Sequence, residues 1–186
     1  SVDTSQAFAQ EYMELEDRVV HQHGPEGEHA HEGYAFTTWL DPRLALQQAE
    51  AIYQAFVERW PERETVFTAG WETLRDDWLA LDAQLTAVHA DYDNQPLLAS
   101  HPVYQYLARR CSWNLVSLHW EPDQMPDDQQ WSELEQLCED HPAGWMIWEE
   151  EPLPEIRQRL ADRGIDCAVF APCGNVPESG DLLSMM

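Results

Sequence analysis

The chain contains no lysine: its ten basic residues are all arginine, set against 35 aspartates and glutamates. The formal net charge is therefore −25 at pH 7. A surface this acidic repels nucleic-acid backbones and anionic lipid, so neither is an expected partner, whereas cations are attracted without specificity. No run approaches the roughly 18 apolar residues that span a bilayer, so direct insertion into a membrane is not expected either.

Motifs of common enzymes and of small zinc folds are also missing. The sequence has no G-x-S-x-G elbow, H-E-x-x-H helix, P-loop or G-x-G-x-x-G turn, so we do not expect an enzyme. The four cysteines lack C-x-x-C spacing, and an oxidising compartment would allow one or two disulfides whose pairing the spacing does not determine. No secretory signal precedes Ser1, which leaves a mature, a trimmed and a cytosolic chain open.

Histidine is concentrated in one short glycine- and proline-containing loop. Two His-x-His pairs lie there, formed by His21, His23, His29 and His31. Neutral imidazoles can chelate one Zn²⁺ or Cu²⁺ near neutral pH, so the loop is a candidate metal site. The alternative is a solvated loop without metal, because glycine, proline and glutamate surround the histidines.

Two helices are expected after this loop. Asp41-Pro42 has the residues of a helix start, and Pro61 ends the first helix. A second helix is expected from about residue 62 to 89, on the order of 40 Å long at 1.5 Å per residue. Gly70 weakens it by roughly 1 kcal/mol relative to alanine. Its apolar positions alternate steps of four and three without a break: Phe67, Trp71, Leu74, Trp78, Leu81, Leu85 and Val88.

From residue 96 short apolar runs alternate with helical segments. Strands are expected at 97–100, 113–119, 144–148 and 166–170, and helices at 102–110, 129–138 and 154–163. This alternation predicts an α/β fold, a four-stranded parallel sheet flanked by helices, with the long helix extending from it. The expected organisation is an amino-terminal segment with the histidine loop (1–36), two helices (37–95) and an α/β lobe (96–186).

Candidate ligands follow the expected strands. Ligands of open parallel sheets bind beyond the carboxyl ends of the strands, and His101 and several carboxylates, Glu150 among them, occupy those ends. His101 and Glu150 are therefore expected metal ligands. The alternatives are a capping role for His101 and a solvated turn for the glutamates. The four strand ends lead into Ser100-His101-Pro102, Trp120-Glu121-Pro122, Glu149–Pro152 and Ala171–Gly174.

Several motifs along the chain occur in the order known from one protein family. A histidine-rich loop, Trp39-Leu-Asp-Pro42, a very long helix, Ser100-His-Pro-Val-Tyr-Gln-Tyr106 and Glu150-Glu-Pro152 follow one another. In this the chain resembles the zinc/manganese ABC-transporter solute-binding proteins, over nearly its whole length but only in that family's second half. The resemblance implies two lobes bridged by a long helix, Zn²⁺ or Mn²⁺ bound between them, and a periplasmic location. It also implies an ABC-transporter permease or an amino-terminal lobe as the partner.

The resemblance also implies an altered metal site. The family's first ligand lies in an amino-terminal lobe, the second corresponds to Thr37, the third matches His101, and the fourth corresponds to Ala171. Three functions follow: the carboxy-terminal lobe of a zinc-binding homologue with weak or altered binding, a metal buffer or chaperone acting through the histidine loop, and a pseudo-binding protein kept for protein–protein contact. Counting imidazoles favours the loop as the main zinc site.

Overall fold

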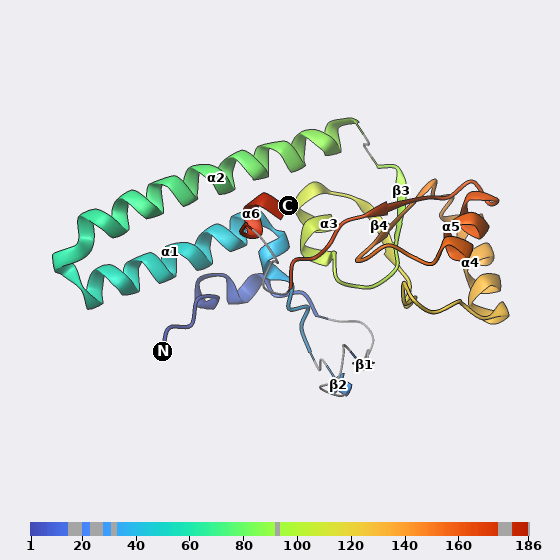
Figure 1. The fold of residues 1–186 in the computed structure, drawn as a ribbon, viewed down its shortest axis with the longest axis horizontal. Coiled ribbons are helices and arrows are strands. Elements are labelled where there is room, and N and C mark those ends of the chain that lie inside the picture. The colour runs from blue at the N-terminus through green and yellow to red at the C-terminus, as the bar shows by residue number, and fades with distance from the viewer. Residues whose placement is uncertain (15–19, 23–27, 31–32, 92–93, 175–179, 186) are drawn as a thin grey trace. The chain divides into compact units, whose positions relative to one another are not determined.

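Figure 1 shows the computed structural model of the chain, which describes residues 1–14, 20–22, 28–30, 33–91, 94–174 and 180–185. The chain divides into two compact units, Ser1–Asp82 and Ala83–Met186. The boundaries expected near residues 36 and 95 remain predictions. The elements are η1 (Gln6–Glu11), β1 (Val20–Gln22), β2 (Glu28–Ala30), η3 (Thr38–Leu40), α1 (Pro42–Arg59), η4 (Pro61–Arg63), α2 (Glu64–Asp91), β3 (Pro96–Ala99), α3 (Gln105–Cys111), β4 (Asn114–Ser117), α4 (Asp128–Asp140), β5 (Trp145–Trp148), α5 (Pro154–Ala161), β6 (Asp166–Val169) and α6 (Leu182–Met185).

The start of α1 is as the sequence predicts. The Asp41 carboxylate accepts a hydrogen bond from the backbone N–H of Arg43 at 2.9 Å, and Pro42 occupies the first turn. The helix ends at Arg59, just before Pro61 opens the single 3-10 turn η4. α2 begins directly after this turn.

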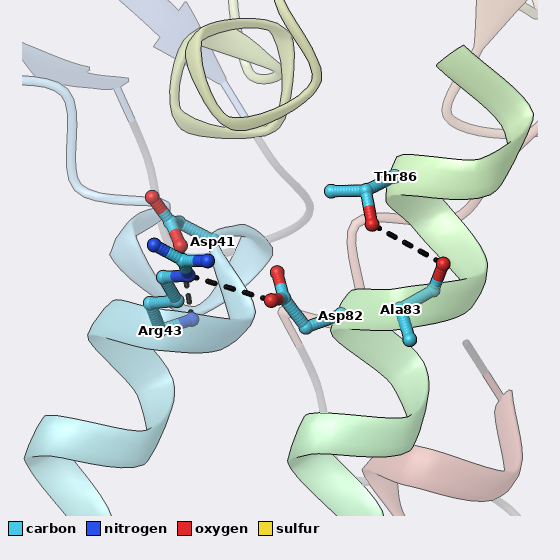
Figure 2. A network of polar contacts seen from close by, with 5 residues as sticks. All are labelled: Asp41, Arg43, Asp82, Ala83 and Thr86. Atoms are coloured by element: carbon cyan, nitrogen blue, oxygen red, sulfur yellow. Dashed lines mark hydrogen bonds and ion pairs between the residues drawn. The ribbon is translucent and has the colours of Figure 1, made fainter. Parts of the chain in front are cut away.

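Polar and aromatic contacts join α1 to the part of α2 that belongs to the first unit. The rings of Tyr53 and Trp71 stack at 5.6 Å, and the Tyr53 hydroxyl lies 3.0 Å from that of Thr68. Figure 2 shows Arg43 reaching from α1 to Asp82 on α2, with 3.4 Å between Nε and Oδ2. These contacts lie along much of the length of α1, so they hold the two helices of the first unit as a hairpin.

The long helix is continuous, as predicted. α2 contains 28 residues and passes Gly70 without a break, which corresponds to about 42 Å at 1.5 Å per residue. Its predicted apolar face is only partly covered, because Trp78 and Leu81 are buried whereas Leu74 and Val88 are exposed. The four-three spacing therefore predicted the helix correctly, but it did not predict how little of the face is buried.

The second unit contains a four-stranded sheet that is parallel throughout, in the order β4-β3-β5-β6. This confirms the predicted fold class. Three strands are slightly shorter than expected, and β3 has the expected length but begins one residue earlier. α3 begins at Gln105 because the chain first turns at His101–Val103, where Val103 N–H donates to the His101 carbonyl at 2.9 Å.

The core of this unit gathers around three tryptophans. Trp120, Trp131 and Trp148 are each at most 3% exposed, and the Trp120 and Trp131 ring centroids lie 4.8 Å apart. α4 is fixed at its start by a capping box between Asp127 and Gln130. Burial of such large rings holds the sheet and its helices together, and so fixes the strand ends on which the candidate site lies.

The cysteines, the β1–β2 pair and the hydropathy of the helices complete the description of the fold. The four cysteines all lie among the described residues and carry thiols, with no disulfide between them. β1 and β2 pair antiparallel. No described helix combines the length and apolar character needed to cross a bilayer.

Candidate functional site

The carboxyl ends of the sheet strands share one edge, as predicted, because all four strands are parallel. β3 leads to β4 on one side of it, whereas β5, its neighbour on the other side, leads away from it to β6. The connections from the neighbouring strands β3 and β5 therefore leave in opposite directions. This is the place where ligands bind in open α/β sheets.

His101 lies at this point, two residues after the end of β3. The residue is 3% exposed, so its imidazole is enclosed by protein. Its Nε2 lies 3.4 Å from Oε1 of Glu121, and its Nδ1 lies 3.8 Å from Oε1 of Glu149. The two ring nitrogens thus face two different carboxylates, one from the segment after β4 and one from the residue after β5.

The segment after β4 brings two polar side chains to the edge. The N–H groups of Leu118 and Trp120 donate to the carbonyls of Ala99 and Ser100 at 2.8 and 2.9 Å, so pairing with the β3 segment continues past Ser117. Side chains alternate along such a segment.

Because Trp120 points into the core, its neighbours His119 and Glu121 point away from it. The His119 ring meets the His101 ring edge-on, with 6.3 Å between centroids. Two imidazoles and two carboxylates therefore gather at this edge of the sheet.

Two further buried groups line the same region. The Ser100 hydroxyl is buried, and its oxygen has no hydrogen-bond partner among the described residues. The Tyr104 hydroxyl donates to the Phe170 carbonyl at 2.6 Å. Burial raises the pKa of the Tyr104 hydroxyl, with smaller contributions from the Glu149 charge and from Cys173, so this phenol stays protonated. An unpartnered hydroxyl and a high local negative charge both favour a bound cation or water.

The family-matched positions offer few donors. Thr37 is buried in the first unit, and a threonine hydroxyl is a poor zinc ligand. Ala171 follows β6 on the expected edge and has no donor side chain; its carbonyl accepts the thiol hydrogen bond of Cys173 at 3.3 Å. Burial raises the pKa of the Cys173 thiol, which disfavours the thiolate that metals bind.

The remaining predicted ligands are distributed as follows. Glu150 is exposed, and Glu149 beside it is the residue that faces His101. In the histidine loop, the backbone register sets His21 opposite His29. His23 and His31 lie outside the described residues. Across the part of the chain that is described, no three His, Cys, Asp or Glu side chains are arranged to hold a metal ion.

Glu121 follows the second expected strand in the sequence, but it is not among the residues predicted to bind metal. Which carboxylate faces His101 depends on the strand order, because β4 and β5 are the two neighbours of β3. The available signal was the alternation around Trp120. A large aromatic residue expected in the core implies that the residues before and after it face outward.

Comparison with known proteins gives one family match. Residues 2–186 match the family described as zinc-uptake complex component A, periplasmic. A stretch of 72 residues, 39% of this chain and 26% of the relative, is 29% identical to a Chlamydia trachomatis protein whose name refers to metal binding.

Solved structures share the fold. The metal-dependent lipoprotein YcdH of Bacillus subtilis superposes with a TM-score of 0.72 at 18% identity, covering 90% of this chain and 57% of that one. The Zn(II)-bound ZnuA-like domain of Streptococcus pneumoniae AdcA gives 0.71 at 17% identity, covering 82% and 60%. The chain thus spans less than two thirds of the length of these structures.

Proposed function

The chain belongs to the zinc-uptake complex component A family, and from this premise we propose that it is a metal-binding solute-binding protein homologue with an altered zinc site. The site lies at the carboxyl edge of the parallel sheet and is centred on His101. The ion is cargo, to be passed to an ABC-transporter permease, and the protein is not an enzyme.

The observation that carries this proposal is the burial of His101 between two carboxylates at the point where ligands bind in such sheets. A buried imidazole flanked by negative charge is a favourable place for a dication, because the ion offsets the repulsion between the carboxylates. The acidic surface of the whole chain adds attraction for cations.

The affinity is expected to be lower than that of a site closed by four protein ligands. Structural zinc sites use four side chains in a tetrahedron. Here Thr37 and Ala171 stand at two positions where the family has ligands, and neither is a good donor. Water completes the coordination sphere, so Zn²⁺ binds weakly and exchanges readily.

A second candidate is the histidine loop acting as a metal buffer. The observation in its favour is the register of β1 and β2, which sets His21 opposite His29 in an antiparallel pair. Counting imidazoles also favours the loop. The pair of carboxylates facing His101 favours the sheet edge over the loop as the zinc site. A count of imidazoles alone ignores these carboxylates.

Calorimetric titration with Zn²⁺ tests both candidates. Three chains are compared: the natural sequence, His101→Ala, and a loop variant with all four loop histidines changed to alanine. We expect His101→Ala to remove the stronger binding event and the loop variant to retain it. The opposite pattern would transfer the function to the loop, and a chain that takes up no Zn²⁺ at millimolar concentration would refute both.

A further inference from the structure

The position of Glu121 carries an inference that rests on the proposed function and goes beyond it. Glu121 approaches the Nε2 atom of His101. It does not correspond to any of the four ligand positions that the family resemblance implies. It comes from the segment after β4, whereas Thr37 precedes α1 and Ala171 follows β6. We infer that the Glu121 carboxylate is the second protein ligand of the zinc ion held by His101, in place of the donors missing at Thr37 and Ala171.

The spacing of the two atoms fits one tetrahedral ion. Zinc binds histidine nitrogen at about 2.0–2.1 Å and carboxylate oxygen at about 2.0–2.2 Å, so two such ligands at a tetrahedral angle lie about 3.3–3.5 Å apart. The Nε2–Oε1 distance is 3.4 Å. An ion can therefore bind both groups without any change in their separation, once its two bonds replace the present contact between them.

Glu149 supplies the orientation that such a ligand needs. Metal-bound histidines usually direct their second nitrogen at a carboxylate, which fixes the tautomer and makes the first nitrogen a better donor. Glu149 lies on the Nδ1 side of His101, opposite to Glu121. It is a positioning residue that acts on the ion through the imidazole.

The solvent exposure of the two carboxylates agrees with these two roles. The Glu121 side chain is 42% exposed, whereas the Glu149 side chain is 19% exposed. An ion beside Glu121 can therefore exchange with solvent and keep bound water, while Glu149 remains inside. The His119 imidazole is not needed by this two-ligand site, and its ring lies 6.3 Å from that of His101.

The test measures Zn²⁺ affinity by competition with a chromophoric chelator, using the 186-residue chain with the four loop histidines changed to alanine. In this background we expect Glu121→Gln to weaken binding at least as much as the roughly 10- to 100-fold loss typical of outer-shell partners. Glu149→Gln should weaken it by about tenfold. Circular dichroism of each variant confirms that the fold is retained.

Glu150→Gln is the matched control, since it removes the same charge from an exposed position on the same edge. We expect it to leave the affinity within about twofold, because an exposed charge is screened by salt. Glu121→Asp separates ligation from charge, because it keeps the carboxylate but withdraws it by one methylene. A ligand role predicts weaker Zn²⁺ binding, whereas a purely electrostatic role predicts unchanged binding.

The outcomes distinguish this inference from the proposed function. If His101→Ala abolishes binding while Glu121→Gln or Glu121→Asp matches the parent chain, the inference is wrong and the function stands. If Glu150→Gln causes the same loss as Glu121→Gln, the effect is general electrostatics and the inference is also wrong. If the parent background binds no Zn²⁺, the proposed site itself fails.

Discussion

Two glycines permit a controlled test of the backbone of this fold. A Cβ added at Gly70 or at Gly164 would meet no atom within 4 Å, so neither substitution by alanine introduces a clash. The positions differ in backbone conformation. Gly70 lies inside α2, whereas Gly164 has a φ of +77°. Any difference between the two alanine variants therefore reports on the backbone alone.

The expected effects have opposite signs. At Gly70 alanine restricts the unfolded chain and favours the helix, which should stabilise the protein by about 0.5–1 kcal/mol. At Gly164 alanine is forced into the left-handed region, which should cost about 1–2 kcal/mol.

The surroundings of Gly164 show why its conformation is fixed. Its N–H donates to the Ala161 carbonyl at 2.9 Å and the next N–H, of Ile165, donates to the Leu160 carbonyl at 3.0 Å, which is the Schellman ending of a helix. Ile165 and Leu160 are both buried in the core of the second unit. A residue that leaves the left-handed region would break these two hydrogen bonds and displace Ile165 from the core.

Urea unfolding followed by circular dichroism measures both effects. Because the chain has two compact units, separate transitions are to be fitted if they occur, and Gly70→Ala should then shift only that of Ser1–Asp82. An unchanged m-value shows that the change is in stability. Destabilisation by Gly70→Ala would refute the continuous, uncrowded helix, and a neutral Gly164→Ala would refute the helix ending.

Three further predictions concern protonation. Zn²⁺ affinity should fall as the pH is lowered, because protons compete with the metal for imidazole nitrogen, and zinc titrations at several pH values measure this. Burial raises the pKa of the Tyr104 hydroxyl, so its pKa is higher in the folded than in the unfolded chain. The contribution of this group to the free energy of unfolding is therefore complete below about pH 10 and declines above it. Urea unfolding at alkaline pH should show this decline. Burial also raises the thiol pKa of Cys138, Cys167 and Cys173, so iodoacetamide should alkylate them more slowly at pH 8 than a model peptide thiol, by mass spectrometry; equal rates would contradict their burial.

The helices and strands could be predicted from the sequence because local signals determine them. Asp41-Pro42 marks the start of α1, the four-three spacing marks α2, and short apolar runs between helices mark the parallel strands. Parallel pairing then places every strand end on one edge, so His101 could be assigned to that edge. These inferences need only neighbours in the sequence and the handedness of the chain.

The arrangement of side chains at the edge could not be predicted in the same way. Glu149 and Glu150 are adjacent and chemically identical, and only the direction in which the chain leaves β5 decides that Glu149 faces His101. Glu121 comes near His101 because β4 is a neighbour of β3. That adjacency is a property of the strand order, and no local pattern around Glu121 encodes it.

The strand order also determines which unit of the protein supplies the proposed metal ligands. His101, Glu121 and Glu149 all belong to the unit Ala83–Met186, whereas the resemblance to solute-binding proteins implies ligands from two lobes. A site between lobes couples metal binding to their relative position, because the ion is bound fully only when both contribute. A site formed within one unit binds independently of the other, and it has fewer protein ligands. The proposed site therefore predicts both lower affinity and faster exchange than a site between lobes, because its second ligand comes from the segment after β4.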